Sequence, residues 1–260
     1  MVKVASYNVA GLRAILKKPQ FSEFIYNTEI DILCIQETKA DVHQIVLDGE
    51  ICNKFPYRYY NSTKGTTQRR GLSGTAIWCK TEPLKQLVTP EFDEEGRIIA
   101  LEFAEYVIVC VYVPNSQKLE SARYYFRQTW NDYFIKYIKS LEALCKPVII
   151  CGDMNVALHD IDISNPGQKK NRVAGFFDSE REQFRKLLDT CNICDVYRYF
   201  NSTGRASTYW SNFLKAKRDK TNGWRIDYIL ITHQLINSIN KIEIIDSVEC
   251  SDHCPIILEF

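Results

Sequence analysis

Apolar runs that end in a polar residue recur along the chain, and the clearest of them covers residues 148–155. It begins with four apolar residues, a pattern that predicts a strand buried on both faces. Gly152 is expected to let the backbone turn sharply. Asp153 and Asn155 are two residues apart, so their side chains should point the same way from the extended strand end. Taken alone, the stretch is more simply explained by an Asx turn that closes the strand.

The same combination of a strand and a polar end is repeated throughout the chain. Strands are expected over residues 2–7, 31–39, 74–79, 97–103, 106–113, 148–151, 224–231, 242–245 and 256–260. Helices are expected over residues 21–26, 119–144 and 178–189. Loops at the edge of a sheet present reactive side chains on a rigid scaffold. The polar residues at or just beyond the strand ends are Asn8, Glu37, Tyr112, Asn115, Asp153, Asn155, Asp227, Asp252 and His253.

These side chains are carboxylates, amides and one histidine, without a nucleophilic serine or cysteine, and they favour metal-assisted hydrolysis by water. Glu37 fits a hard cation such as Mg²⁺, although a surface pair with Lys39 is the alternative. Asp227 lies within an apolar strand, where a buried carboxylate needs a hydrogen-bond donor. Asp252 is next to His253, and Asp227 could fix one ring nitrogen of this histidine. The other nitrogen would then act on a phosphate or a water.

The longest helical pattern, over residues 119–144, has an apolar stripe along one face. Such a stripe is typical of a helix that packs on a core, and we interpret it as core rather than as a cofactor site. Its members are Tyr125, Trp130, Phe134, Tyr137 and Leu141.

Composition limits the class of protein. The chain has 260 residues, of which 45% are hydrophobic and 25% are charged, and this fits one globular domain over residues 1–260. No linker, low-complexity run or internal repeat divides it. The net charge is +1, so binding of a polyanion must depend on local basic loops, here residues 64–71 and 168–172. No apolar stretch reaches the ~18 residues that a membrane span needs.

The cysteines and the start of the chain bear on its compartment. Most of the ten cysteines lie in apolar runs, where a free thiol acts as a small hydrophobic group. A predicted strand follows Met1 directly, so no secretion signal is expected. These observations predict an intracellular, reducing compartment, either the cytoplasm or the nucleus. Cys191 and Cys194 form a lone C-x-x-C motif, which is not sufficient to predict a zinc site.

Eight short motifs occur in order over essentially the whole chain. They lie at residues 7–13, 35–39, 112–115, 152–155, 165–166, 174–176, 223–228 and 251–255. Each is weak alone, but the ordered set is specific. On these motifs the chain resembles the exonuclease III family of abasic-site (AP) endonucleases, within the wider DNase I-like phosphoesterases.

The resemblance implies an α/β fold, a four-layer sandwich of two packed mixed β-sheets flanked by helices. It also implies hydrolysis of DNA on the 5′ side of an abasic site, which leaves a 3′-hydroxyl, with Mg²⁺ as cofactor and Mn²⁺ as an alternative. Removal of 3′-blocking groups and 3′→5′ exonuclease activity are expected to accompany it. The implied partner is double-stranded DNA with abasic sites or blocked 3′ ends, bound by a monomer and without a membrane.

Roles for individual residues follow from the motif match. Glu37 is implied as the main metal ligand, with Asp252 close to the metal. Asp153 would orient or deprotonate the attacking water, and Asp227 would orient His253 towards a phosphate oxygen. Either Asp153 or His253 could take the proton. The scissile phosphate would be held by Asn155, Asn115, Asn8 and Tyr112.

Substrate selection has a physical basis, because a sugar without a base leaves the stack at little cost and can enter a tight pocket. By motif match, the apolar walls of this pocket would be Trp210 or Tyr209, Trp224 and Ile226. The side chains implied to enter the duplex are Lys118, Phe213 and Leu214. The residues implied to bind the DNA backbone are Arg13, Lys39, Lys64, Arg69, Lys169, Lys170 and Asn171, so that affinity should fall steeply with salt.

The chain departs from the family at Ala10, where an acidic or amide residue is usual. Ala10 cannot ligate a metal, which leaves open whether one or two metals bind. Two other functions are alternatives. The first is a related metal-dependent phosphoesterase acting on inositol phosphates, a phospholipid or intact nucleic acid. The second is a non-catalytic DNA-binding protein of the same fold, which the intact residues Glu37, Asp153 and His253 argue against.

Overall fold

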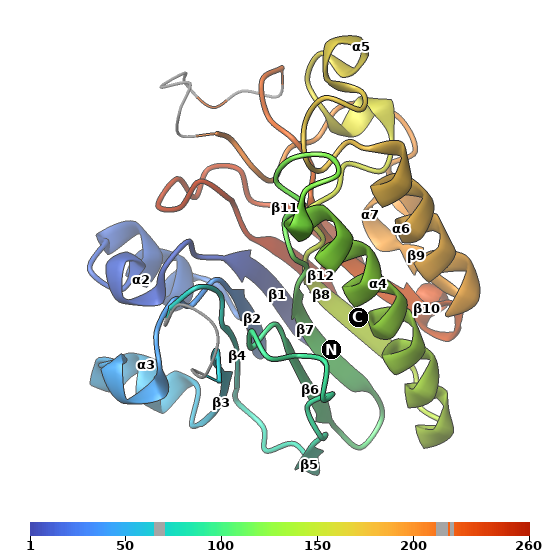
Figure 1. Cartoon of the computed structure of the whole chain (residues 1–260). Helices are drawn as coiled ribbons and strands as arrows, with labels where there is room; N and C mark the ends of the chain where they lie inside the picture. Colours follow the sequence, from blue (N-terminus) through green and yellow to red (C-terminus); the bar gives the residue numbers. More distant parts are fainter. Residues whose placement is uncertain (65–70, 212–217, 219–220) are drawn as a thin grey trace.

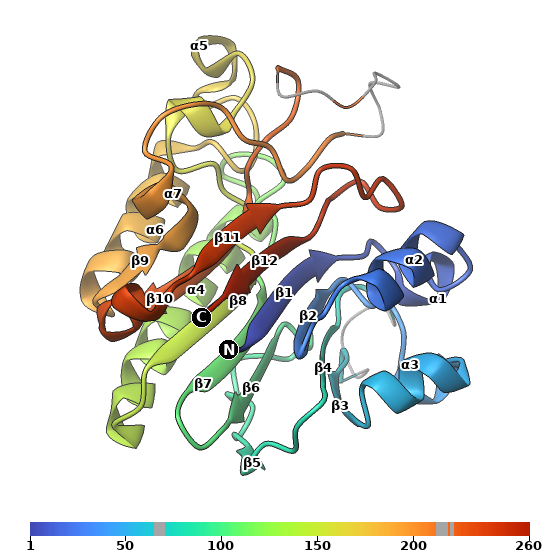
Figure 2. The ribbon, with the colours of Figure 1, turned by 180° about the vertical axis from the view of Figure 1, so that it is seen from behind.

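The computed structural model describes residues 1–64, 71–211, 218 and 221–260. Two six-stranded sheets lie face to face, and helices cover their outer sides (Figures 1 and 2). Three apolar layers hold them together: one between the sheets, one between the first sheet and its helices, and one between the second sheet and its helices. The expected four-layer α/β sandwich is therefore confirmed.

The first sheet has the strand order β11-β12-β1-β2-β4-β3. Only β1 and β2 run parallel in it, and the other neighbours are antiparallel. Its strands are β1 (Lys3–Asn8), β2 (Ile32–Gln36), β3 (Tyr57–Asn61), β4 (Thr75–Cys79), β11 (Lys241–Ile244) and β12 (Ile256–Glu259).

The second sheet has the order β5-β6-β7-β8-β10-β9 and repeats this pairing pattern, with β7 and β8 as its one parallel pair. Its strands are β5 (Lys85–Gln86), β6 (Ile98–Glu102), β7 (Val107–Tyr112), β8 (Val148–Asp153), β9 (Ile193–Asp195) and β10 (Asp227–Thr232). The central strands are buried on both faces because successive side chains enter different apolar layers. Ile149, for example, packs between the sheets, and Ile150 packs under the helices.

Helices α1, α2 and α3 lie against the first sheet, and α4, α6 and α7 lie against the second (Figures 1 and 2). Their bounds are α1 (Leu12–Ile15), α2 (Pro19–Asn27), α3 (Gly49–Lys54), α4 (Ala122–Ser140), α5 (Pro166–Lys169), α6 (Asp178–Thr190) and α7 (Val196–Phe200). Short 3₁₀ helices cover Val42–Gln44, Leu141–Leu144, Asp160–Asp162 and His233–Ser238.

All nine expected strands and all three expected helices are present, with some differences. Strands β3, β5 and β9 were not predicted, because β5 and β9 are very short and β3 is half-buried without clear alternation. The strand expected from residue 224 begins only at Asp227, because Trp224 instead bridges to Ile163 and Tyr209. The prediction that Tyr125 belongs to the core was wrong. Its side chain is 57% exposed, and the neighbouring Tyr124 contacts Phe177 instead.

Gly152 does not make the sharp turn that was expected of it, because it lies inside β8. A Cβ atom at this position would lie 1.9 Å from the carbonyl oxygen of Val111, so glycine is needed for the close approach of β7 and β8. The change of direction comes later, at Asn155, whose φ is 48°.

All ten cysteines lie in the described part of the chain and are free thiols. Among the helices that the structure describes, none combines the length and the apolar character needed to cross a membrane.

We expect Gly152→Ala to lower the free energy of unfolding by about 1–3 kcal/mol, because the added methyl group must displace β7. Gly167→Ala is the matched control, since a Cβ there meets nothing within 4 Å. It should stay within about 1 kcal/mol of the wild type. Urea denaturation followed by circular dichroism measures both, and equal stabilities would contradict the close-approach explanation.

Candidate active site

Strand ends from both sheets meet at one edge of the sandwich. In the second sheet, the register places Tyr112 opposite Asp153 and places Asp227 on the other side of Asp153. The three side chains therefore start from neighbouring backbone positions. The first sheet contributes Asn8 at the end of β1 and Glu37 directly after β2. The Asn8 amide donates a hydrogen bond of 2.9 Å to Asp153 Oδ2, which joins the two sheets at this edge.

A cleft of about 480 Å³ opens at this edge. Most of the residues predicted for the site line it, although they come from many separate parts of the chain. They are Glu37, Lys39, Tyr112, Asn115, Asp153, Asn155, Lys169, Tyr209, Trp224, Ile226, Asp252 and His253. Asn8 and Asp227 are 1% and 2% exposed and lie behind this lining.

Asp153 and Asn155 form a fixed unit at the end of β8. Asp153 Oδ1 accepts a hydrogen bond of 2.8 Å from the backbone N–H of Asn155. The Asn155 amide donates to the carbonyl of Val113 and accepts from the side chain of Asn115, at 2.8 and 3.0 Å. Burial, aided by the nearby Asp227 carboxylate, raises the pKa of Asp153 above its usual range, while His253 opposes this effect. A carboxylate of raised pKa is better suited to accept a proton near neutral pH.

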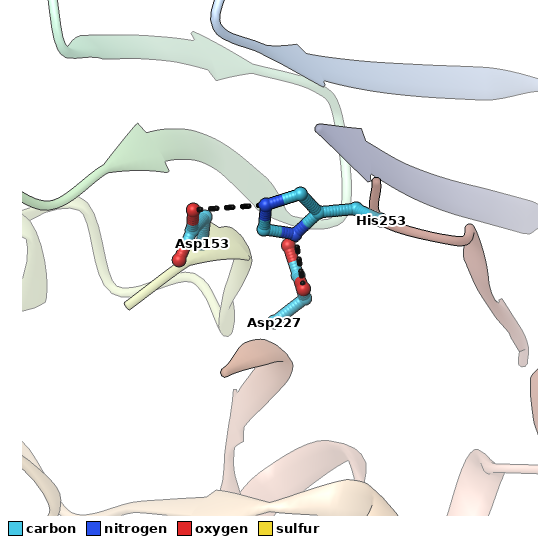
Figure 3. Close-up of side chains that lie close together, drawn as sticks. All are labelled: Asp153, Asp227 and His253. Atoms are coloured by element: carbon cyan, nitrogen blue, oxygen red, sulfur yellow. Dashed lines mark hydrogen bonds and ion pairs between the residues drawn. The ribbon is translucent and has the colours of Figure 1, made fainter. Parts of the chain in front are cut away.

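His253 and Asp227 form a buried hydrogen-bonded pair beside Asp153 (Figure 3). The Nδ1 atom of His253 lies 2.8 Å from Asp227 Oδ2, and Nε2 lies 3.9 Å from Asp153 Oδ2. Burial by itself lowers the pKa of His253, but the carboxylates of Asp227, Asp153 and Asp252 outweigh it and raise this pKa to about 10. The imidazole is therefore protonated at neutral pH, and Nε2 presents a charged donor to the cleft.

Two further carboxylates, those of Glu37 and Asp252, face the cleft and could hold a metal ion. Glu37 has a φ of 55° and accepts a hydrogen bond from the hydroxyl of Tyr112. Its other oxygen lies 3.0 Å from Nζ of Lys39. Two accessible carboxylates in a polar cleft suit a hard cation that keeps some of its water.

Asp153, Asp227 and His253 form a second possible ligand group, with ligand atoms within 4.8 Å of one another. Their closest contact, however, is the hydrogen bond between His253 and Asp227. A cation bound to both partners would have to replace this bond. The donor set therefore fits a metal better at Glu37 and Asp252.

The apolar part of the cleft is formed by Tyr209, Trp224 and Ile226. The rings of Tyr209 and Trp224 meet edge to face at 6.4 Å, and Tyr209 lies 4.8 Å from the ring of His253. Trp210 is not part of this lining. It is 6% exposed, and the guanidinium of Arg218 covers its ring at 4.8 Å. Of the two residues that the sequence left open, Tyr209 is the one that lines the cleft.

The predicted DNA-binding residues are only partly brought together. Lys39 and Lys169 line the cleft, and Lys39 also lines an adjoining groove of about 580 Å³ together with Arg13. The Asn171 side chain exchanges two hydrogen bonds of 2.7 Å with Asp178, so it is engaged within its own loop. Three other residues predicted to bind DNA are exposed and lie outside both the cleft and the adjoining groove: Lys64, Lys118 and Lys170. The predictions for Arg69, Phe213 and Leu214 lie outside the described residues.

Buried arginines that hold the strand ends were missed in the sequence. Arg97 donates to the carbonyl of Tyr112 at 2.9 Å, and its guanidinium lies 4.5 Å from the Tyr112 ring. Arg127 reaches the turn after β8, and Arg225, next to the cleft wall, is fully buried with Asp162 and Asp195. For Arg127 a signal existed, because it shares a helical face with Trp130 and Phe134, where a charged residue is unusual.

Comparison with known proteins identifies the family of the chain. Residues 5–253 match the model of the Endonuclease/Exonuclease/phosphatase family. The chain is 38% identical to an exodeoxyribonuclease of Bacillus subtilis, over 99% of this chain and 98% of that protein. It is also 38% identical to the DNA repair nuclease APEX1 of Danio rerio, over 99% of this chain and 81% of that protein.

Among solved structures, an AP endonuclease from Archaeoglobus fulgidus superimposes with a TM-score of 0.87 at 27% identity, covering 100% of this chain and 99% of that one. The likeness therefore covers both sheets. The chain therefore belongs to the Endonuclease/Exonuclease/phosphatase family and, within it, to the exodeoxyribonucleases and AP endonucleases.

Proposed function

We propose that this nuclease hydrolyses the phosphodiester on the 5′ side of an abasic site in double-stranded DNA and leaves a 3′-hydroxyl. Removal of 3′-blocking groups and 3′→5′ exonuclease action would use the same cleft. The observation that carries the proposal is the meeting of Asp153, the His253–Asp227 pair and an apolar wall in one cleft.

Asp153 is proposed to orient the attacking water and accept its proton. The raised pKa of Asp153 supports this role, while the raised pKa of His253 supports a different one. A protonated His253 donates a hydrogen bond to a phosphate oxygen and stabilises the charge that develops there. Of the two candidates for taking the proton, Asp153 is thus the better one.

The amides of Asn155 and Asn115 and the hydroxyl of Tyr112 are proposed to hold the scissile phosphate. Asn8 has a different place from the one expected, since it is buried and donates to Asp153. Its proposed role is therefore to orient the Asp153 carboxylate.

Glu37 and Asp252 are proposed to hold Mg²⁺, with Mn²⁺ as the alternative. A cation bound there supplies positive charge next to the phosphate oxygens. Ala10 offers no ligand atom, which favours a single principal metal position.

Selectivity for an abasic site is proposed to come from Tyr209, Trp224 and Ile226. They form an apolar wall that suits a sugar without its base, which flips out at low cost. Lys39 and Lys169, with Arg13 in the adjoining groove, would bind backbone phosphates. Further backbone contacts are proposed for the outlying residues Lys64, Lys118, Lys170 and Asn171.

The unit that acts is proposed to be one domain, residues 1–260, working as a monomer. Both sheets contribute residues to one cleft, which supports a single domain. The ten free thiols are in keeping with a reducing compartment, for which the cytoplasm or nucleus is proposed.

The proposed substrate is tested with two duplexes of the same sequence, one of which carries a single tetrahydrofuran abasic analogue. With Mg²⁺ present, we expect cleavage directly 5′ to the analogue, at least ~100-fold faster than cleavage of the intact duplex, because only the abasic sugar fits the pocket. Gel analysis of the products should show a 3′-hydroxyl end. Equal cleavage of both duplexes would instead indicate a phosphoesterase with a different substrate.

The metal assignment is tested by chelation and by direct binding. EDTA should abolish cleavage and Mg²⁺ should restore it. Glu37→Gln should weaken binding of Mn²⁺, measured by electron paramagnetic resonance without DNA, by roughly 10-fold or more, because a charged ligand is lost. Glu23→Gln, a substitution outside the cleft, is the control and should change nothing. Activity that persists after thorough chelation would overturn the assignment.

The His253–Asp227 pair is tested with Asp227→Asn. Removal of this carboxylate should lower the pKa of His253, which NMR titration of the imidazole measures. The variant loses the imidazolium at lower pH, so the alkaline limb of the cleavage profile should shift to lower pH. Turnover near pH 8 should fall by roughly 100-fold. Asp132→Asn, in an exposed pair with Lys186, is the control. An unchanged His253 titration would rule out the proposed role of Asp227.

A further inference from the structure

A buried ion pair lies directly beneath the turn that carries Asp153 and Asn155. Arg127 comes from α4 and Glu180 from α6, two helices that lie side by side on the outer face of the second sheet (Figure 1). The Arg127 Nη1 atom is 3.0 Å from Glu180 Oε1, and the side chains are 1% and 0% exposed. Neither residue lines the cleft.

The guanidinium of Arg127 reaches from this pair into the turn. Nη1 donates to the carbonyl of Asn155 at 2.8 Å, and Nη2 donates to the carbonyl of Met154 at 3.0 Å. The turn includes a left-handed residue, since Asn155 has a φ of 48°. Such a conformation persists only where surrounding contacts hold it. Arg127 supplies two of these contacts, both on the side opposite the cleft.

Glu180 fixes the position of the Arg127 guanidinium. One of its oxygens pairs with Arg127, and the other accepts a hydrogen bond of 3.0 Å from the backbone N–H of Phe177, at the start of α6. The carboxylate is therefore fixed at both oxygens. The planar fork of an arginine holds its donors in a fixed geometry towards a carboxylate and two carbonyls, whereas the three donors of a lysine rotate at the end of a flexible stem.

Stability alone does not explain this pair, because well-packed apolar side chains often stabilise a fold as well as a buried ion pair does. We propose that Arg127 is a positioning residue for phosphodiester hydrolysis, which fixes the 153–156 turn so that the Asp153 carboxylate and the Asn155 amide face the same phosphate. Glu180 orients Arg127 for this role. The inference rests on the functions proposed above for Asp153 and Asn155.

The decisive variant is the double substitution Arg127→Met/Glu180→Met. It removes both donors to the turn but leaves no unpaired buried charge, so it should lower the thermal midpoint less than Arg127→Met alone and leave the protein folded. We expect kcat on the abasic duplex to fall roughly 100-fold, since a misplacement of about 1 Å has this effect. KM should stay within about threefold, because the DNA-contacting surface is unchanged.

Arg58→Met is the matched control. Arg58 also donates to two backbone carbonyls, those of Cys52 and Phe55 at 3.2 and 2.5 Å, but these lie at the end of α3, outside the cleft. This variant should lose some stability and keep the wild-type kcat. A wild-type kcat in the folded double variant would overturn the positioning role. Should the double variant not fold, Glu180→Gln provides the same comparison with a roughly 10-fold loss expected, since its shape is kept and only its charge is lost.

Chemical rescue separates positioning from a general loosening of the helices. In Arg127→Ala, guanidinium ions have room at the truncated site, beside a cavity of about 20 Å³ lined by Arg127, Asn131 and Glu180. At millimolar concentrations, far below those that unfold proteins, they should raise kcat at least ~10-fold. They should have no effect on Arg58→Ala. Absence of rescue in a folded variant of lowered kcat would overturn the inference.

Failure of this inference and failure of the proposed substrate give different results. If the wild type cleaves the intact and abasic duplexes equally, the substrate proposal fails, and the variants are then compared on the intact duplex. A further readout needs no substrate. Hydrogen exchange of the backbone amides at residues 153–158 should be faster in Arg127→Met than in the wild type and unchanged in Arg58→Met, whereas equal exchange in all three would overturn the inference.

Discussion

The register between β7, β8 and β10 is the constraint on which the site depends. It places Tyr112, Asp153 and Asp227 next to one another at one edge of the second sheet. This register requires a close approach of β7 and β8 that only glycine permits at position 152. Because side chains alternate along a strand, a slip of one residue would turn Asp153 away from the cleft. The relative positions of Tyr112, Asp153 and Asp227 are therefore a consequence of strand pairing.

The two sheets are joined at the candidate active site. The hydrogen bond from Asn8 to Asp153 links the ends of β1 and β8, and the apolar layer between the sheets lies directly behind it. Buried Arg97 holds the backbone at Tyr112, and buried Arg127 holds the turn after β8. Buried contacts thus hold the backbone around the cleft, while polar side chains line the cleft and can contact a substrate.

The pKa values of Asp153 and His253 are both raised in the cleft. Burial leaves Asp153 as a better proton acceptor, and the surrounding carboxylates keep His253 protonated. A cationic imidazole and accessible carboxylates for a metal then face the same space, which suits a substrate that is itself an anion. Perturbed groups of this kind are typical of active sites. The overall charge of +1 gives no indication of this local arrangement.

The sequence by itself determined the longer apolar strands, their polar ends and the family, because apolar periodicity and short motifs depend on residues that are close in the chain. Only the tertiary structure decided which polar ends meet. Asn8 and Asp153 are 145 residues apart, and their contact depends on how two sheets pack. The same packing decided that Tyr209, and not Trp210, lines the cleft, and that Arg127 lies under the catalytic turn. Such contacts depend on long-range register and burial, for which a local pattern of residues carries no information.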